Sequence, residues 1–407
     1  MTDIPKGFSP KPYPYHHELN LEIDSLSNLG LGIGREKGWV IQVPFVLPGE
    51  IVRVRIFRNH KNYSSADCIE ILEQSASRTN PVCEIFGECG GCQYQHANYD
   101  FQLKWKTQQV KELFSRIGGM DLEVKMALGS PIQYGYRSKL TPHYEKWHSG
   151  RKFQIGFLKS GTRRKLVDVE SCPIATPSIN KAIPTVRKML LEKAPTLKKG
   201  GTLLFRDTEE GVVQEPSALV EERVGNLIFQ FRAGEFFQNN PFILPKLVDH
   251  VIHEAQGDIE SKYLIDAYCG SGLFGLSGAS YFQKVTGVEI SQKSFLGAQA
   301  NAKLNMITNA EFILGDASSI FEHLDHALRP CSLIIDPPRK GCDAGFLDQT
   351  LSFAPDYIIY VSCDPSTQAR DAKTLCLGGY RIENVQPFDL FPHTRHIENV
   401  VTFKKDC

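Results

Sequence analysis

The chain has 407 residues, 42% of them hydrophobic, and its 46 basic and 46 acidic side chains leave a formal net charge of zero. These values are typical of a globular protein of two or three domains, and the neutral charge means that any nucleic-acid surface must be local. The chain has no apolar run long enough to span a membrane and no signal-peptide pattern at its N-terminus, so we expect a cytoplasmic protein without a membrane partner. In such a reducing compartment, eleven cysteines favour metal ligation or catalysis over disulfides.

Residues 1–12 are predicted to form a loose tail, and an all-β pattern begins at Glu18. Apolar and polar residues alternate over 19–23, and further strands are predicted at 39–43, 51–56 and 66–72. Gly30, Gly32 and Gly34 are interpreted as a turn between the first two strands. Several short strands within about 60 residues predict a small closed barrel of the OB type.

A cysteine cluster follows the predicted barrel. Cys83, Cys89 and Cys92 fall within ten residues, and two glycines, which let the backbone fold tightly around a metal, separate the last two. This spacing predicts a metal site, and Cys172 is the best candidate for its fourth ligand. Tetrathiolate sites hold zinc or an iron–sulfur cluster. One unsymmetric triplet plus a distant fourth cysteine favours a [4Fe–4S] cluster, with zinc as the alternative.

Residues 97–118 are predicted to form a helix that ends at paired glycines, and residues 128–235 a mixed α+β region. The segment from 137 to 165 contains nine basic side chains and one acid, Glu145, with aromatic residues interleaved. Basic groups neutralise phosphates and flat rings stack on unpaired bases, so this segment suits single-stranded RNA, although a solvated basic hairpin is the alternative. The nine are Arg137, Lys139, Lys146, Arg151, Lys152, Lys159, Arg163, Arg164 and Lys165.

The C-terminal third shows apolar strands alternating with helices. Strands are predicted at 263–266, 285–290, 312–314, 332–335 and 357–361, and helices at 291–305 and 344–353. This alternation predicts a doubly wound, mostly parallel sheet.

Polar and glycine residues follow these strands where ligands bind in open α/β sheets, beyond the carboxyl ends. The first strand leads into the turn Gly270-Ser271-Gly272, and Glu289 ends the second, where an acid can accept hydrogen bonds from ribose hydroxyls. Asp316 follows the third strand as an adenine contact or, equally, a helix cap, and Asp336 follows the fourth. The series predicts a methyltransferase that uses S-adenosylmethionine (SAM).

The strand at 357–361 runs directly into Ser362-Cys363-Asp364-Pro365. A cysteine at a strand end is well placed to attack a substrate, although taken alone it is more often a small buried residue.

The N-terminal segment resembles the TRAM domain, a small RNA-binding barrel, in Gly30-x-Gly32-Ile33 and in Val43-Pro44 followed by Pro48-Gly49-Glu50. The whole chain resembles the RNA uracil-5-methyltransferase family, and most closely its iron–sulfur-containing branch, which methylates uridine in ribosomal RNA. The motifs that carry this resemblance are Phe236-Phe237-Gln238-x-Asn240, Asp266-x-Tyr268-Cys269-Gly270-x-Gly272, Asp336-Pro337-Pro338-Arg339-Lys340-Gly341, Ser362-Cys363-Asp364-Pro365 and His396-Ile397-Glu398-Asn399-Val400.

The resemblance implies a multidomain α/β protein with a TRAM-like barrel at 13–76, a small α+β central domain at 77–96 and 128–235 that holds the cysteine cluster and the RNA surface, and a Rossmann-like class I methyltransferase domain at 97–127 and 236–407. It implies that Cys363 adds to C6 of uracil and that Glu398 removes the C5 proton. The SAM site would include Gln238, Tyr268, Glu289 and Asp336 beside the glycine turn, and Arg137 and Lys139 would contact the RNA. Ribosomal RNA is favoured over transfer RNA as the substrate, and we expect a monomer.

Three other functions compete with this interpretation. Cytosine-5 methylation also uses a cysteine that adds to C6, but the Asp336-Pro337-Pro338-Arg339 motif and Glu398 with its neighbours argue against it. A non-catalytic RNA-binding protein of the same fold would have lost the cysteine or the glycine turn, and both are present. An iron–sulfur redox protein would change its activity with the oxidation state of the cluster.

Overall fold

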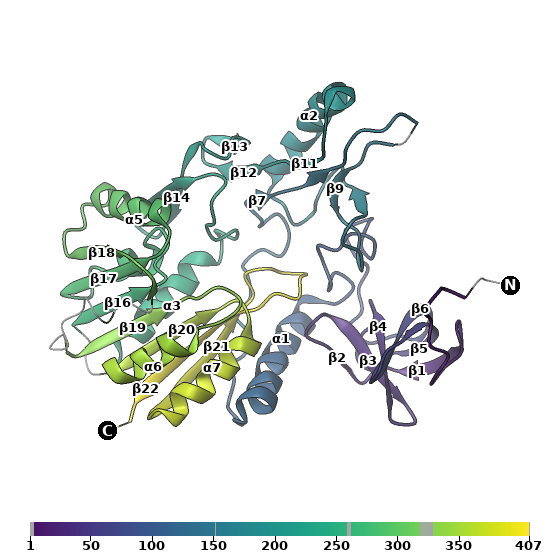
Figure 1. Cartoon of the computed structure of the whole chain (residues 1–407), viewed down its shortest axis with the longest axis horizontal. Coiled ribbons are helices and arrows are strands. Elements are labelled where there is room, and N and C mark those ends of the chain that lie inside the picture. The colour runs from purple at the N-terminus through teal and green to yellow at the C-terminus, as the bar shows by residue number, and fades with distance from the viewer. Residues whose placement is uncertain (1–3, 151, 259–261, 318–320, 322–328, 407) are drawn as a thin grey trace. The chain divides into compact units, whose positions relative to one another are not determined.

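A computed structural model of the chain describes residues 4–150, 152–258, 262–317, 321 and 329–406, so Arg151 of the basic segment lies outside the described residues. The chain divides into two compact units (Figure 1). The first unit consists of Met1–Gln102, Phe157–Val167 and His393–Arg395. The second unit consists of Leu103–Gly156, Asp168–Pro392 and His396–Cys407.

The first unit is built on a six-stranded sheet with the strand order β1-β5-β6-β4-β3-β2. Neighbouring strands are antiparallel except β4 and β6, which run parallel. Apolar side chains such as Leu21, Ile41 and Val54 form one buried cluster inside it. This strand-rich half-barrel confirms the predicted N-terminal β module. The strands are β1 (Glu18–Glu22), β2 (Ser25–Leu26), β3 (Leu31–Glu36), β4 (Trp39–Pro44), β5 (Ile51–Asn59) and β6 (Tyr63–Glu73).

The glycines near residue 30 differ from the prediction. Gly30 makes a turn with a φ of +77°, but Gly32 and Gly34 lie within β3 and not in a turn. A Cβ atom on Gly34 would lie 2.3 Å from the carbonyl oxygen of Glu22, and one on Gly32 would lie 2.2 Å from Cγ2 of Val46. These two glycines are therefore needed for close packing inside the barrel.

The second unit begins within α1 (Tyr99–Leu113), which is extended by a π-helical turn over Phe114–Gly118. The predicted helix over 97–118 is therefore confirmed except for its first two residues. The predicted α+β region follows, with one long helix, α2 (Pro177–Lys193), and short strands. The strands are β7 (Lys139–Leu140), β8 (His143–Tyr144), β9 (Ile155–Leu158), β10 (Leu166–Asp168), β11 (Gly201–Thr202), β12 (Phe205–Thr208), β13 (Gly211–Val213), β14 (Leu219–Val224) and β15 (Leu227–Arg232).

A seven-stranded sheet with the order β18-β17-β16-β19-β20-β22-β21 forms the centre of the second unit. Five strands are parallel, whereas β22 runs antiparallel to both β20 and β21. The predicted doubly wound, mostly parallel sheet is confirmed. The strands are β16 (Tyr263–Ala267), β17 (Lys284–Glu289), β18 (Ala310–Leu314), β19 (Cys331–Ile335), β20 (Tyr357–Ser362), β21 (Tyr380–Phe388) and β22 (Glu398–Lys405).

Helices cover both faces of this sheet (Figure 1). Ile359 and Val361 of β20 point into one apolar cluster with α3, α4 and α5, and Ile358 and Tyr360 point into another with α1, α6 and α7. Because side chains alternate along a strand, a strand buried on both faces is mostly apolar, as β20 is up to Ser362. The helices are α3 (Leu244–Gln256), α4 (Leu273–Gly278), α5 (Gln292–Leu304), α6 (Ala344–Phe353) and α7 (Pro365–Leu377).

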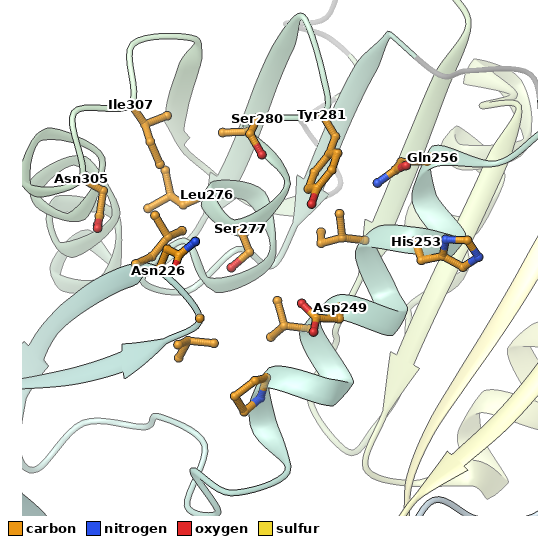
Figure 2. A pocket seen from close by; sticks show the side chains of 17 residues that line it. Asn226, Asp249, His253, Gln256, Leu276, Ser277, Ser280, Tyr281, Asn305 and Ile307 are labelled. Carbon is orange, nitrogen blue, oxygen red and sulfur yellow. The ribbon is translucent and has the colours of Figure 1, made fainter.

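A cavity of about 820 Å³ lies in the second unit, between the turn of the β14–β15 hairpin, one side of α3 and the ends of α4 and α5 (Figure 2). Asp249, His253, Ser277 and Tyr281 are among its lining residues. It lies at the amino edge of the parallel strands, since α4 and α5 end there before β17 and β18 begin. None of the site residues expected from the sequence lines this cavity.

Within the described residues, no helix combines the length and the apolar character that crossing a bilayer requires.

We predict that Gly34→Ala lowers the free energy of unfolding of the first unit by about 1–3 kcal/mol, because the added methyl group overpacks the barrel. Thermal or urea unfolding, followed by a probe in the barrel, measures the effect. Glu36→Ala at the end of the same strand serves as the control. An unchanged stability of the Gly34 variant would contradict the packing role.

Candidate active site

Three expected site residues lie at the ends of three neighbouring strands. Asp336 follows β19, Cys363 follows β20, and Glu398 is the first residue of β22. In the antiparallel pair of β20 and β22, Ser362 lies opposite Asn399. One position further along the pair, Cys363 after Ser362 comes beside Glu398 before Asn399. The parallel pairing of β19 with β20 brings Asp336 to the same edge of the sheet.

The two carboxyl groups of this cluster share a poorly solvated environment. Glu398 is only 3% exposed. Burial first, and then the charge of Asp336, raises the pKa of Glu398 well above its usual range, while the guanidinium of Arg339 opposes this rise. Burial also raises the pKa of Asp336. Both groups therefore keep a proton at a higher pH than exposed carboxyl groups do.

The thiol of Cys363 is influenced by the same charges. Burial, followed by the nearby Glu398 and Asp336, raises its pKa to about 11, and Arg339 opposes the rise through its charge and a hydrogen bond to the thiol. An Nη2 atom of Arg339 also lies 3.3 Å from Nδ1 of His396. Arg339 is therefore the cation that favours the thiolate, a part that sequence reasoning did not assign although it identified the motif.

A buried amide pair fixes the strands that carry Cys363 and Glu398. The Gln368 side chain on α7 donates hydrogen bonds to the carbonyl oxygens of Tyr360 at 2.8 Å and Asn399 at 3.1 Å. Asn399 donates in return to the Gln368 side-chain oxygen at 2.7 Å. The residue after Cys363, Asp364, caps α7 by accepting the amide hydrogen bond of Ser366 at 3.0 Å. Side chains with locked partners hold a reactive pair in one geometry.

The glycine-rich turn after β16 has the open backbone expected of a ligand site. Gly270 has a φ of +55°, and a Cβ atom placed there would meet no atom within 4 Å. Tyr268 also has a positive φ, +68°, an uncommon conformation for a residue other than glycine and one that clusters at functional sites. The turn therefore leaves room for a ligand against its backbone.

Two acids accept hydrogen bonds from backbone amides in and around this turn. Glu289 accepts backbone hydrogen bonds from Gly270 at 2.9 Å and Ser291 at 2.7 Å, one on each carboxylate oxygen. Asp266 accepts one from Gly275 at 2.8 Å, and its other oxygen is buried with no partner among the described residues. Burial raises the pKa of Asp266 to about 8. Each Glu289 oxygen keeps a lone pair for a ribose hydroxyl, so these residues fit a nucleoside ligand such as SAM.

The remaining residues expected at the cofactor site lie on nearby segments of the second unit. The Tyr268 ring packs edge-on against Phe346, with centroids 5.5 Å apart. Ser271 accepts a hydrogen bond from Asn301 on its carbonyl oxygen at 3.0 Å, and Gly272 precedes α4. Gln238 is buried in the segment after β15, and Asp316 is exposed after β18.

Arg137 and Lys139 make contacts within the protein. The Nζ atom of Lys139 donates to the carbonyl oxygens of Gly234 and Glu235, each at 2.9 Å, and its pKa is lowered to about 8, first by burial and then by the charges of Arg206 and Arg137. The guanidinium of Arg137 lies over the ring of Phe391, 5.7 Å from its centroid. These bonds hold the segment that leads to Gln238.

The cysteine loop belongs to the first unit, and Cys172 belongs to the second. Burial raises the pKa of the Cys83 and Cys89 thiols, and nearby backbone amides oppose the rise. Among the described residues, no three His, Cys, Asp or Glu side chains form a group that could hold a metal ion.

Comparison with known proteins gives family-level matches over most of the chain. Residues 209–406 match the family model described as tRNA (uracil-5-)-methyltransferase, and residues 19–76 match the TRAM domain of tRNA (uracil(54)-C(5))-methyltransferase. The chain is 40% identical to a tRNA (uracil(54)-C(5))-methyltransferase of Schizosaccharomyces pombe, over 97% of this chain and 79% of that protein. It is 32% identical to the protein of the same name from Saccharomyces cerevisiae, over 100% of this chain and 76% of that protein.

A solved structure shares the fold. The Pyrococcus abyssi tRNA (uracil-54, C5)-methyltransferase, in complex with S-adenosyl-L-homocysteine, superimposes with a TM-score of 0.72 at 24% identity, covering 95% of this chain and all of that one.

We predict that Cys363 reacts slowly with iodoacetamide at pH 7 and roughly tenfold faster for each pH unit up to about pH 10, because only the thiolate reacts and the pKa is about 11. Arg339→Ala should slow the reaction at pH 9, whereas the control Lys340→Ala should not. Mass spectrometry of the peptide that contains Cys363 separates it from the other cysteines. A plateau below pH 8 would contradict the raised pKa.

Proposed function

The chain belongs to the tRNA (uracil-5-)-methyltransferase family, whose members methylate C5 of uracil in RNA with SAM, and we propose that its substrate is transfer RNA at uridine 54. The Schizosaccharomyces pombe and Saccharomyces cerevisiae relatives carry this activity in their names, and so does the matching TRAM model. The preference for ribosomal RNA drawn from the sequence gains no support from these relatives. Transfer RNA is accordingly the first substrate to test.

The proposed reaction begins at Cys363. Its thiolate adds to C6 of the target uracil, and the electrons of the C5–C6 double bond move into the ring as an enolate, which makes C5 nucleophilic. When bound, SAM supplies the electrophilic methyl group that C5 takes up. A covalent intermediate of this kind divides one difficult step into easier ones.

Glu398 completes the proposed reaction as a general base. Its carboxylate takes the proton from C5, the electrons of the C5–H bond re-form the C5–C6 double bond, and the C6–S bond breaks with its electron pair returning to Cys363. Cys363 and Glu398 lie side by side at the ends of paired strands. This placement suits Cys363 to act at C6 of the uracil and Glu398 to act at the neighbouring C5. This juxtaposition is the observation that carries the proposal.

The pKa values give a direction for the pH dependence of the proposed reaction. Cys363 must lose its proton to attack, and Glu398 must be ionised to accept one, yet both pKa values are raised. The active forms of both residues become more populated as the pH rises, so turnover should increase from neutral to alkaline pH. Arg339 would favour both anions.

The proposed cofactor site combines the turn Gly270-Ser271-Gly272 with the side chains that surround it. The partnerless oxygen of Asp266 and the open space at Gly270 support this assignment. We assign Glu289 to the ribose, since one of its oxygens binds the turn at Gly270 and the other binds the amide of Ser291 before α5. The other proposed contacts are Gln238, Tyr268, Asp316 and Asp336.

The RNA surface is proposed to use the exposed members of the basic segment as phosphate contacts, including Lys146, Lys152 and Arg164. We propose that Lys139 contributes to RNA binding indirectly, by holding the backbone next to exposed Phe236. Its ammonium group already binds the two carbonyl oxygens that precede Phe236. Arg137, stacked on Phe391, would act beside it.

We also propose that Cys83, Cys89, Cys92 and Cys172 hold a [4Fe–4S] cluster. The spacing of the first three cysteines supports it, as do the backbone amides that favour the thiolate forms of Cys83 and Cys89. The cluster would shape the protein and take no part in methyl transfer.

The substrate proposal predicts 5-methyluridine in unmodified transfer RNA after incubation with SAM and wild-type protein, and none with Cys363→Ala. Mass spectrometry of the nucleosides measures the product, and Cys376→Ala, a half-buried cysteine of α7, is the matched control. A transcript with cytidine at position 54 should remain unmethylated. Modification of ribosomal RNA alone would overturn the choice of substrate, and 5-methylcytidine or no product would favour the competing functions.

For the cluster, protein made under anaerobic, iron-replete conditions should contain about four irons per chain. Cys172→Ser should lose most of this iron, whereas Cys68→Ser, a cysteine of β6, should keep it. Iron analysis and visible absorbance are the readouts. Wild-type protein that binds zinc, or no metal, would contradict the assignment.

A further inference from the structure

Lys106 on α1 and Asp389 after β21 form an ion pair that is completely buried. The Nζ atom of Lys106 lies 2.6 Å from Oδ1 of Asp389, and both side chains are 0% exposed. Removing two charges from water costs several kcal/mol for each ion, so a well-packed apolar pair would serve stability at least as well. The pair therefore calls for an explanation other than stability.

The pair fixes the backbone of the turn that leaves β21. Lys106 Nζ also donates to the carbonyl oxygen of Phe391 at 3.3 Å, and Asp389 Oδ1 accepts the amide hydrogen bond of Phe391 at 3.2 Å. The amide of Asp389 donates to the carbonyl oxygen of Leu128 at 2.8 Å. Directional bonds of this kind select one conformation of the turn, which apolar contacts would not.

Two more side chains hold the same turn. Asn240 donates to the carbonyl oxygen of Leu390 at 2.9 Å, and the hydroxyl of Tyr136 donates to that of Pro392 at 3.0 Å. Each of the four residues 389–392 is thus held by a side chain from elsewhere in the second unit or by its own pair with Lys106.

The position of the pair relates it to Glu398. Phe388, the last residue of β21, lies directly opposite Glu398, the first residue of β22. Asp389 is therefore next to the register partner of Glu398, at the point where the ladder between the two strands ends. A shift of this turn would move the end of the ladder and the carboxyl group with it.

We propose that the Lys106–Asp389 ion pair is a positioning device for Glu398, which keeps its carboxylate aimed at the C5 proton of the methylated intermediate. The inference rests on the proposed function, in which Glu398 is the base. A base acts only within hydrogen-bonding reach of its proton, and a misplacement of about 1 Å can cost about 100-fold in rate.

A loosened pair should affect one step and leave the preceding one intact. Attack by Cys363 and methyl transfer come before proton removal, so they do not need Glu398 in place. If the C5 proton stays, the C6–S bond does not break, and the methylated RNA remains joined to Cys363. The expected signature is an accumulated covalent complex and not a general loss of activity.

The test uses Lys106→Met/Asp389→Asn in the full-length protein. Methionine keeps the length of the lysine stem, and asparagine keeps an acceptor for Phe391, so no buried charge is left alone. Lys104→Met, an exposed lysine on the same helix, is the matched control. Lys106→Gln/Asp389→Asn is the second variant if the first does not fold, because it too leaves no buried charge and it keeps a hydrogen-bond donor at position 106. Circular dichroism checks the fold of each.

The measurement is a single turnover with transfer RNA and SAM labelled in the methyl group. Denaturing gels give the labelled RNA–protein complex, and nucleoside analysis gives released 5-methyluridine. We expect methyl transfer within about twofold of wild type and release slowed about tenfold or more, with the complex accumulating. Release at the wild-type rate, or methyl transfer and release slowed equally without the complex, would overturn the inference.

Glu398→Gln, run in parallel, separates this inference from the proposed function. If Glu398→Gln accumulates the complex and the folded Lys106 and Asp389 variants do not, the base is supported and the positioning device is refuted. If Glu398→Gln releases product normally, the proposed base is wrong, and the positioning inference falls with it.

Discussion

The candidate site depends on the antiparallel pairing of β22 with β20. In an all-parallel sheet, the first residue of a strand lies at the amino edge, far from the ends where ligands bind. Because β22 runs the other way, its first residue, Glu398, arrives at the carboxyl edge beside Cys363. The amide pair of Gln368 and Asn399 and the clamped turn after β21 hold this arrangement from two sides.

This arrangement collects negative charge in a place with little water. Asp336, Glu398 and the Cys363 thiol all have raised pKa values, because burial disfavours their charged forms, and the neighbouring acids add to the rise at Glu398 and Cys363. Arg339 is the cation that offsets them. Each group therefore ionises less readily than it would in water, and hydrogen bonds from a substrate would change this balance.

The ends of the neighbouring strands β16 and β17 leave the backbone open to a ligand. Glu289 uses both of its oxygens to hold amides near the glycine turn, and Tyr268 adopts a left-handed conformation there. The family membership gives this edge its meaning, since the reaction requires SAM and a uracil base to meet. Most of the proposed cofactor contacts come from the parallel strands, and the proposed general base, Glu398, comes from the antiparallel strand.

Signals that are local in the chain were readable from the sequence alone. Apolar patterns predicted four strands of the first unit and five of the central sheet, but not β21 or β22. The glycine turn after β16 and the acids at the ends of β17 and β19 were found at strand ends, and Cys363 was recognised after β20. These predictions succeed because strand periodicity and turn chemistry are properties of a few adjacent residues. The misread case, Gly32 and Gly34, fails for the opposite reason, since Glu22 and Val46 across the barrel decide what those glycines do.

Only the tertiary structure decided which distant charges meet. Lys106 and Asp389 are 283 residues apart, and a lysine on an amphipathic helix is normally exposed to solvent, so no pattern pointed to a buried pair. Lys139, which was expected at the RNA, binds two carbonyl oxygens of its own chain, and Arg339 acquires its influence on Cys363 only after β19 and β20 pair. The sequence by itself determined the parallel strands, the glycine turn and the residue types of the site, because these depend on neighbours in the chain. Burial, partners and pKa values were decided by folding, because they depend on desolvation and on charges brought together across the sheet.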